Sequence, residues 1–466
     1  MARKMSPLDA SWLFVDSPRT PMHVGVLAIF SKPDDAEPDF IKSLFAHLRG
    51  PHGFAPPFNL RLKRPKLQLL SSRLIPAWEE TNEVDLEYHL RHSALPQPGG
   101  ERELGVLISR LHSYALDFSR PLWECHIIEG LENGRFALYM KMHHSLVDGV
   151  GGMRMVSRLL SPDAHAGNLP PPWAVGSGEK KTSGALRRRG SPWQQLADQL
   201  KRQAGHAPEV GKALMETWTE AVQQHHPELG SPFRAPLSML NRKISAQRRF
   251  ATQYYDLARI RALGKRAKVT VNDVFLCMCA GALRRYLAEL GRLPNEALTA
   301  GLPVSVRTAD DNGSGNAISF IIANLHTHIA DPLERLAAIK ASTLQAKQRF
   351  LKLPREAVTG YTALFMAPFM LQLVTGLGGL TRPMFNVTIS NVPGPSSVLY
   401  FNGARMEQMY PVSLLSHGQA LNITVVSYAG QFNVGYTGCR ETLPHVQRLS
   451  VYTGEALEEL ERLVEA

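Results

Sequence analysis

The segment from residue 123 to residue 160 constrains the fold more than any other part of the chain. Two apolar runs, Trp123–Glu129 and Phe136–Met142, flank the pair Asn133-Gly134, and this arrangement is the strongest local signal for a β-hairpin. After a short polar loop, Val150–Leu160 has the apolar spacing of a helix. A hairpin that leads directly into a helix predicts an α/β fold, with the polar loop at the edge of a sheet.

The rest of the chain shows the same mixture of strand and helix signals. Because 466 residues are too many for one ordinary core, we expect two halves, residues 1–160 and 247–466. A Pro-, Gly- and Lys/Arg-rich crossover, residues 161–246, would join them. Strands are expected at His23–Phe30, Leu298–Val306, Ile318–Thr327, Phe385–Ser390, Leu421–Tyr428 and Gln431–Tyr436, and helices at Pro38–Leu48, Leu104–Leu116 and Val269–Leu287.

The chain is basic, with a formal net charge of +11. Eight basic and three acidic residues between positions 179 and 212 give the crossover almost half of this excess. A solvated linker face, a membrane-surface contact and a site for a phosphorylated ligand all fit such a run. No helix-turn-helix, zinc-finger or RNP-like pattern accompanies it, so we expect no nucleic-acid partner. The four cysteines form no CxxC pair and no disulfide framework, which is typical of a reducing, cytoplasmic setting.

One long stretch, residues 357–381, contains no charged side chain. Its length would suffice for a membrane span, but it holds one proline and four glycines. A helix that is buried or lines a lipid pocket is therefore favoured over a transmembrane helix. A helix that dips into one membrane leaflet is the remaining alternative.

The loop between the hairpin and the helix carries the chemistry. A side chain at the end of a strand is held rigidly by the sheet and can still face a cleft. Histidine titrates near neutral pH, so His144 is a candidate general base for the removal of a proton from a nucleophile. The Asp148 carboxylate could pair with an arginine or hold the imidazole ring, and Gly149 would allow a tight backbone path beside a ligand.

Other chemistries fit this loop less well. A metal site from His143, His144 and Asp148 is disfavoured because adjacent strand residues point to opposite faces. A hydrolase built on Ser145 meets the same objection, and the chain has no GxSxG sequence. A dinucleotide loop is disfavoured because Arg154 stands where a third glycine is needed. A purely structural histidine pair remains open.

The loop reads HHxxxDG and is followed by a glycine-rich helix start. This resembles the signature of the chloramphenicol acetyltransferase-like superfamily. Further segments narrow the resemblance: Pro7–Trp12, Pro121–Trp123, Asn272-Asp273 and Asn386–Pro395. They are similar, in the same order, to segments of the bacterial wax ester synthase/diacylglycerol acyltransferase family.

The resemblance implies an α/β fold of two chloramphenicol-acetyltransferase-like sandwich halves with an active-site tunnel between them. It implies transfer of a long-chain acyl group from acyl-CoA to a fatty alcohol or to diacylglycerol, without a metal, another cofactor or a covalent enzyme intermediate. His144 would be the base, His143 would be structural or would assist, and Asp148 would be an architectural carboxylate. A cytoplasmic enzyme with peripheral contact to the inner membrane or to lipid inclusions is expected.

The remaining candidates each have a structural and a functional interpretation. A tetrahedral oxyanion needs hydrogen-bond donors, and the end of a predicted strand could supply them, although the same residues could simply form a turn. The apolar stretch at residues 357–380 could form walls for the acyl chain, or an ordinary core helix. The candidates are Thr388, Ser390 and Asn391 for the oxyanion or pocket, His23 for the pocket, Asn272 and Asp273 for helix capping, and Pro121, Leu122 and Trp123 for packing of the hairpin and cleft wall.

Two alternatives to this function stay open. A related acyltransferase with a polyketide or carrier-bound acceptor would differ only in the alcohol that gives an ester. A non-catalytic lipid-binding protein on the same fold would bind lipid without turnover.

Overall fold

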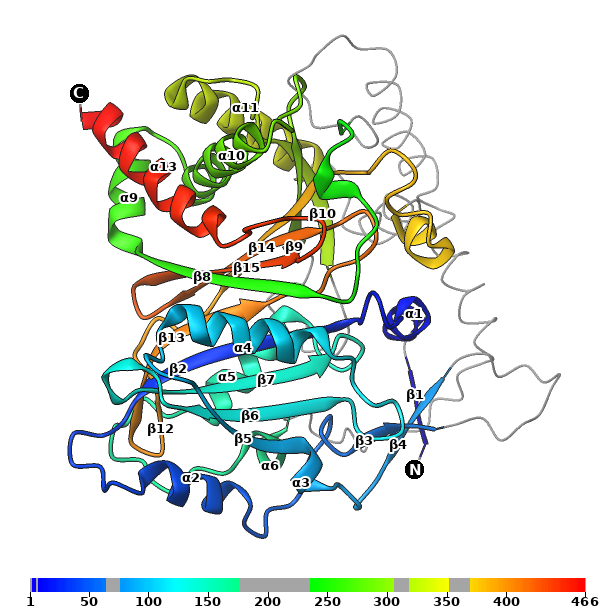
Figure 1. The fold of residues 1–466 in the computed structure, drawn as a ribbon, viewed down its shortest axis with the longest axis vertical. Coiled ribbons are helices and arrows are strands. Elements are labelled where there is room, and N and C mark those ends of the chain that lie inside the picture. Colours follow the sequence, from blue (N-terminus) through cyan, green and yellow to red (C-terminus); the bar gives the residue numbers. More distant parts are fainter. Residues whose placement is uncertain are drawn as a thin grey trace, which may run out of the picture.

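The computed structural model describes residues 2–5, 7–63, 76–176, 235–305, 318–351 and 369–465. The basic run at 179–212 and the first part of the uncharged stretch, residues 357–368, lie outside the described residues. The described chain forms two stacked α/β halves, each built around a six-stranded mixed sheet (Figure 1). The mixed α/β class and the division into two sheet-rich halves are confirmed.

The N-terminal half contains the predicted hairpin. Strands β6 (Trp123–Glu129) and β7 (Phe136–His143) are antiparallel, and the turn between them places Asn133 and Gly134 at φ of 61° and 67°. The sheet order is β12-β13-β2-β7-β6-β5. The other elements of this half are β2 (His23–Ser31), β5 (Leu90–Ala94), α2 (Phe40–Leu48), α3 (Leu86–His89), α4 (Glu101–Ser113), α5 (Gly149–Leu159), α6 (Pro172–Val175), and a small sheet of β1 (Ala2–Lys4), β4 (Ala77–Glu80) and β3 (Leu60–Leu62).

The C-terminal half packs its helices on a second sheet of order β10-β9-β11-β14-β15-β8. Helix α10 (Val271–Glu289) begins where the sequence predicts, because the Thr270 side chain accepts from the Asp273 N–H and caps it. Its buried residues lie all around the helix, and it forms the centre of this core. The remaining elements are β8 (Arg248–Asp256), β9 (Thr299–Ser305), β10 (Ile318–Asn324), β11 (Val387–Pro393), β14 (Leu421–Tyr428), β15 (Gln431–Cys439), α9 (Leu257–Arg266), α11 (Pro332–Leu351) and α13 (Arg448–Glu465).

One segment of the C-terminal half crosses back into the N-terminal sheet. Strands β12 (Tyr400–Phe401) and β13 (Ala404–Val412) extend that sheet, and β13 pairs antiparallel with β2. The two sheets touch where β13 passes β15: a Cβ on Gly435 would lie 2.0 Å from the Pro411 carbonyl oxygen. Glycine at this position therefore permits a backbone contact that any side chain would block. The sequence analysis did not predict β12 or β13.

A buried cation, Lys141, fixes α4 against the sheet. It lies just before the loop of residues 143–149, which we call the histidine loop. Lys141 on β7 is fully buried, and its Nζ lies 3.1 Å from the Glu124 carboxylate. The same ammonium donates to the Leu111 and Tyr114 carbonyl oxygens, at the C-terminal end of α4, at 3.1 and 3.0 Å. Burial raises the pKa of Glu124, but His126 and Lys141 outweigh it and lower this pKa to about 2.

Replacement of this cation is expected to destabilise the fold. Lys141→Met should lower the free energy of unfolding by about 3–5 kcal/mol, because the Glu124 carboxylate would remain buried with only the more distant Arg91 guanidinium, 3.9 Å away. Lys42→Met, at an exposed position of α2, is the matched control and should change it by less than about 0.5 kcal/mol. Urea denaturation followed by circular dichroism measures both values. Equal stability of the two variants would contradict this account of the Lys141 contacts.

Candidate active site

His143, the last residue of β7, is held on both sides of its ring. The Ser145 N–H donates to Nδ1 at 3.2 Å, and the Ser145 hydroxyl lies 2.7 Å from the same atom. Because Nδ1 accepts a backbone proton, the proton of the neutral ring lies on Nε2, which is 3.4 Å from the Asp16 carboxylate. The Asp16 carboxylate also accepts the Met22 N–H at 2.6 Å. These contacts hold the His143 ring in the sheet edge, with Nδ1 bonded to Ser145 and Nε2 buried beside the Asp16 carboxylate.

His144 is placed differently, with its backbone fixed and its ring nitrogen free. Its N–H donates to the Met22 carbonyl oxygen at 2.8 Å. Its Nδ1 is buried and has no hydrogen-bond partner among the described residues. Burial, and to a lesser extent His143, lower the pKa of His144 to about 4, while Asp148 acts in the opposite direction. The imidazole is therefore neutral at pH 7, the state in which a histidine accepts a proton.

Helix α1 (Pro7–Val15) brings a tryptophan against this ring. The ring centroids of Trp12 and His144 are 4.4 Å apart, at an interplanar angle of 34°. The indole Nε1 is buried and, within the described part of the chain, has no hydrogen-bond partner. The sequence analysis used Trp12 only as part of the family resemblance and missed both it and Asp16, since nothing in the linear sequence places them beside residues 143 and 144.

Asp148 and Gly149 begin helix α5. The Asp148 carboxylate accepts the Gly151 N–H at 2.6 Å, so this residue is the helix N-cap. The capping contact is a third role beside the two that the sequence analysis considered. A Cβ on Gly149 would meet Val392 on β11 at 3.7 Å, an ordinary contact. Among the described residues this position has room for a small side chain, so the expected tight backbone path at Gly149 depends on a ligand beside it.

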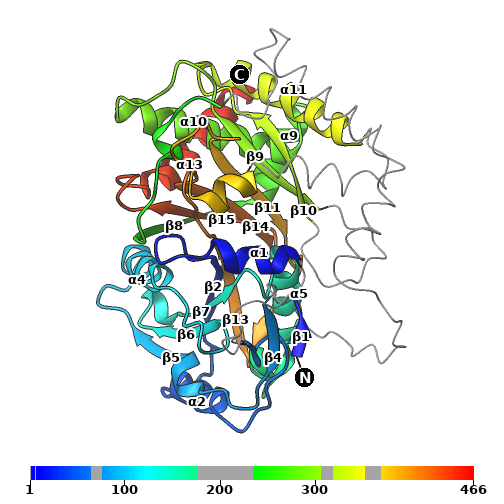
Figure 2. The same cartoon turned by 90° about the vertical axis from the view of Figure 1, so that its right-hand side faces the viewer.

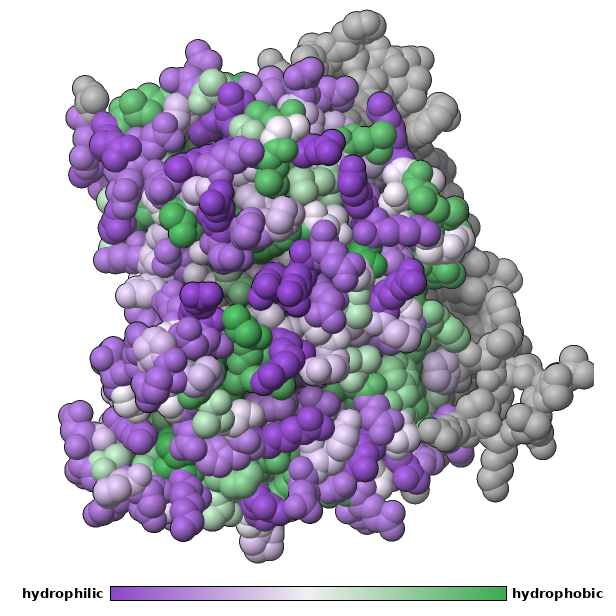
Figure 3. Space-filling model, viewed as in Figure 1, coloured by the Kyte–Doolittle hydropathy of each residue, from purple (hydrophilic) through white to green (hydrophobic). Residues whose placement is uncertain are grey.

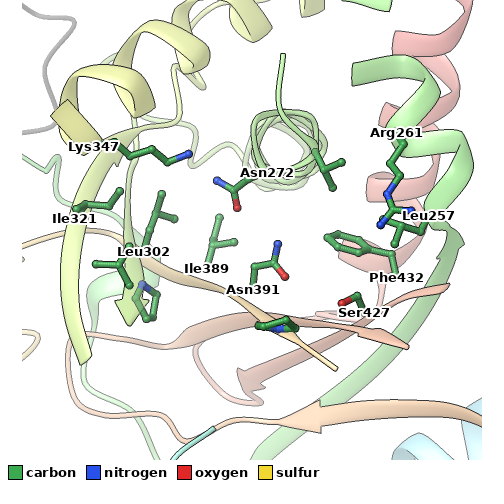
Figure 4. A pocket seen from close by; sticks show the side chains of 14 residues that line it. Leu257, Arg261, Asn272, Leu302, Ile321, Lys347, Ile389, Asn391, Ser427 and Phe432 are labelled. Carbon is green, nitrogen blue, oxygen red and sulfur yellow. The ribbon is translucent and has the colours of Figure 1, made fainter. Parts of the chain in front are cut away.

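A cavity of about 440 Å³ opens in the C-terminal half, among α9, α10, α11, β9, β11 and β14. Figure 4 shows that Asn272 from α10 and Asn391 from β11 point into it, with Lys347 from α11 and Arg261 from α9 on opposite sides. Its remaining wall is mainly aliphatic, with Phe432 as the one aromatic lining residue. The sequence analysis identified the two asparagines as candidates but gave no signal for the two cations.

Strand β11 separates the cavity from the histidine loop: the cavity lies on one face of this strand and the start of α5 lies on the other. Successive side chains of β11 point to opposite faces: Asn391 lines the cavity, whereas Val392 contacts the start of α5. Thr388 and Ser390 share the face of Val392 and are half-buried. The expected turn at this point is wrong, because β11 continues through Pro393 in parallel pairing with β14. The three candidate polar residues are thus divided between the two faces of one strand.

The other candidates are structural in their contacts. The Asp273 carboxylate accepts from the Thr270 N–H, the Thr270 hydroxyl and the Thr343 hydroxyl at 2.6–2.9 Å. His23 is buried, and its Nε2 lies 2.9 Å from the His112 carbonyl oxygen, so it does not line the cavity.

The Pro121–Trp123 segment packs behind the histidine loop. Leu122 and Trp123 are fully buried, and Trp123 stacks on His89 at 4.3 Å. The Leu122 carbonyl oxygen accepts the His143 N–H at 3.0 Å. Pro121 is buried beside them. The segment therefore packs the hairpin as predicted.

The described residues form neither a metal-binding cluster nor a helix that could span a membrane. Nowhere in the described ranges do three His, Cys, Asp or Glu side chains gather as a metal-binding group. Of the described helices, none combines the length and the apolar character needed to cross a bilayer.

Comparison with known proteins places the chain in one family. The model of the wax ester synthase/diacylglycerol acyltransferase catalytic domain matches residues 5–275, and that of the family's C-terminal domain matches residues 314–461. An O-acyltransferase of Acinetobacter baylyi is 40% identical over 99% of this chain and 98% of its own. A provisionally named diacylglycerol O-acyltransferase of Mycobacterium tuberculosis is 44% identical over 98% of this chain and 97% of its own.

Solved structures agree. The wax ester synthase/diacylglycerol acyltransferase of Marinobacter aquaeolei VT8 superposes with a TM-score of 0.77, is 40% identical, and is matched over 99% of this chain and all of that one. The first condensation domain of the calcium-dependent antibiotic synthetase, 15% identical, superposes with a TM-score of 0.61 over all of this chain and 96% of that one, which shows a shared fold alone. The chain is a member of the wax ester synthase/diacylglycerol acyltransferase family.

Proposed function

We propose that this acyltransferase moves a long-chain acyl group from acyl-CoA to a fatty alcohol, which gives a wax ester, or to diacylglycerol, which gives triacylglycerol. In this proposal acyl-CoA is a substrate and no metal or other cofactor takes part. The enzyme would work in the cytoplasm, in peripheral contact with the inner membrane or with lipid inclusions.

The state of His144 is the observation that carries the proposal. A hydroxyl attacks a thioester poorly unless a base removes its proton as the new bond forms. His144 is neutral at physiological pH, its backbone is fixed by Met22, and one ring nitrogen has no hydrogen-bond partner among the described residues. His143 has its Nδ1 bonded to Ser145 and its Nε2 3.4 Å from the Asp16 carboxylate, and would serve as a positioning residue for the loop.

The reaction then needs no covalent enzyme intermediate. The alcohol oxygen attacks the thioester carbon while His144 takes the hydroxyl proton, and the carbonyl oxygen becomes an oxyanion. Collapse of this intermediate breaks the carbon–sulfur bond, and the imidazolium returns the proton to the CoA thiolate. Thr388 and Ser390 are the candidate donors to the oxyanion, because they share the β11 face that meets the start of α5.

The cavity in the C-terminal half fits the donor. Coenzyme A combines phosphates with a pantetheine arm that carries two amides. Lys347 and Arg261 supply charges for phosphate, and Asn272 and Asn391 supply amide donors and acceptors. In this proposal the nucleotide end of acyl-CoA occupies the cavity, and the acyl-pantetheine arm leads past β11 toward the loop of residues 143–149.

Loss of the base should nearly abolish ester formation. With palmitoyl-CoA and hexadecanol or a diacylglycerol, we expect acceptor-dependent release of free CoA by the purified protein. His144→Ala should reduce kcat/KM by at least ~10²-fold, whereas His165→Ala, an exposed histidine, should leave it unchanged. Ester formation with neither acceptor would refute the storage-lipid function and favour a carrier-bound acceptor or a non-catalytic protein. Full activity of His144→Ala would refute the mechanism alone.

The pH profile should report the lowered pKa of His144. Because the neutral imidazole is the active form and its pKa is about 4, kcat/KM should stay level from pH 8 down to pH 5.5 and fall tenfold per unit below that pKa. Circular dichroism at each pH identifies any loss of fold. A midpoint of the kcat/KM profile near pH 6.5, the ordinary pKa of histidine, would contradict the burial of His144 seen in the structure.

The donor subsite can be tested with two thioesters. Lys347→Gln and Arg261→Gln should each raise KM for palmitoyl-CoA by about 10-fold, since a charge-assisted hydrogen bond contributes about 1.5 kcal/mol or more. KM for palmitoyl-pantetheine, which lacks the nucleotide, should change by less than about twofold. Lys265→Gln, an exposed cation of α9 outside the cavity lining, is the control. Equal effects on both thioesters would contradict this placement of the phosphates.

A further inference from the structure

A surface beside α1 exposes aliphatic side chains that the core does not use. Residues 369–375 are helical and lead into a tight loop. Leu371 and Val374 are each 61% exposed, and Leu377 and Leu380 are 44% and 65% exposed. Figure 3 shows apolar surface at the right-hand side, where Figure 1 draws this helix. We call these four residues the apolar face. The sequence analysis considered this stretch as a wall for the acyl chain, but these four side chains point outward.

The apolar face is held rigidly from behind. Phe369 stacks on Phe385 with ring centroids 5.6 Å apart. The Gln372 amide donates to the Thr381 hydroxyl at 2.9 Å and to the Arg382 carbonyl oxygen at 3.0 Å, which closes the loop onto the helix. The outward aliphatic groups therefore belong to a built element and not to a frayed end, so their exposure is a property of the fold.

The surroundings of the apolar face are cationic. It lies in the segment 369–390, and the neighbouring segments 235–250 and 413–420 pack against it; none of the three contains an Asp or a Glu. Gly379 packs on the backbone of Arg242 and Lys243, and the Gly418 N–H donates to the Arg242 carbonyl oxygen at 3.1 Å. The side chains of Arg242, Lys243 and Arg382 are exposed. An aliphatic centre beside three exposed cations, in described segments without a carboxylate, matches a surface of anionic lipid headgroups over acyl chains.

The apolar face lies close to the helix that contacts the candidate base His144. Figures 1 and 2 both show this helix side by side with α1. Trp12 of α1 packs on His144, and Phe14 of the same helix is 61% exposed. The surface that suits a lipid layer is thus one helix away from the residue that would activate a lipid alcohol.

We propose that the apolar face docks the protein on the surface of an anionic phospholipid membrane. Leu371, Val374, Leu377 and Leu380 enter the acyl region, while Arg242, Lys243 and Arg382 contact the headgroups. A diacylglycerol or fatty alcohol dissolved in that leaflet then reaches the catalytic loop along α1. This last step rests on the proposed function; the docking does not.

Vesicle flotation tests the docking. Wild-type protein should float with phosphatidylglycerol/phosphatidylcholine vesicles and bind phosphatidylcholine vesicles at least 10-fold more weakly. The triple variant Leu371→Ser/Val374→Ser/Leu380→Ser should lose at least 10-fold in apparent affinity for the anionic vesicles. The matched control is Val106→Ser/Leu333→Ser/Val451→Ser, at positions 52%, 39% and 52% exposed on α4, α11 and α13, and it should bind like the wild type. Thermal unfolding confirms that both variants are folded.

The outcomes separate the docking from the chemistry. Equal binding of the two triple variants, equal binding of wild type to neutral and anionic vesicles, or binding only to triacylglycerol emulsions would each overturn the proposal. With palmitoyl-CoA and water-soluble hexanol, the apolar-face variant should keep wild-type activity, and it should lose at least 5-fold with vesicle-borne diacylglycerol. If the wild type floats as expected but forms no ester with any acceptor, the docking stands and the proposed function fails.

Discussion

The pairing of β13 with β2 is the constraint on which the rest of this structure depends. Because a strand from the C-terminal half adds to the N-terminal sheet, the two halves cannot separate without breaking a ladder from Arg405↔Ser31 to Val412↔Gly25. The other edge of β2 pairs with β7 and sets His23 opposite His143. Met22, just before β2, contributes the carbonyl oxygen that fixes His144. The chain leading to β13 also includes β11, which brings Val392 to the start of α5. The segment from β11 to β13 thus brings residues of both halves together around the loop of residues 143–149.

The same interface buries polar groups that are usually exposed, and it does so with neutral histidines. His112 lies 2.7 Å from the Tyr139 hydroxyl and 3.1 Å from the Ser413 carbonyl oxygen, which links α4, β7 and the end of β13. Burial lowers the pKa of His112 to about 3 and that of His144 to about 4. Removal of water from these rings costs much less while they stay uncharged than it would for the imidazolium form. The burial that packs the halves therefore also keeps the proposed base unprotonated, so that stability and catalysis rest on one physical cause.

The sequence predicted well what local chemistry determines. The Asn133-Gly134 hairpin, the helix predicted at Val269–Leu287 and the strand–loop–helix around His144 lie where the residue patterns place them. Contacts across the fold were not predictable, because no local pattern records them: the crossing of β13, the stacking of Trp12 on His144, and the Asp16 carboxylate beside His143. For the uncharged stretch, the favoured expectation of a buried helix fails in the described part, residues 369–381, for a related reason. Apolar spacing shows that side chains avoid water but not whether they meet a core or a lipid layer, and Leu371 and Leu380 are exposed.

A crystal structure with a non-cleavable thioether analogue of palmitoyl-CoA and a bound fatty alcohol would test the central claim most directly. The account predicts that the alcohol oxygen lies about 3 Å from a ring nitrogen of His144, with the thioether carbon beyond it and the nucleotide between Arg261 and Lys347. An alcohol oxygen that contacts His143 or a residue of another element, with His144 remote from both ligands, would contradict it.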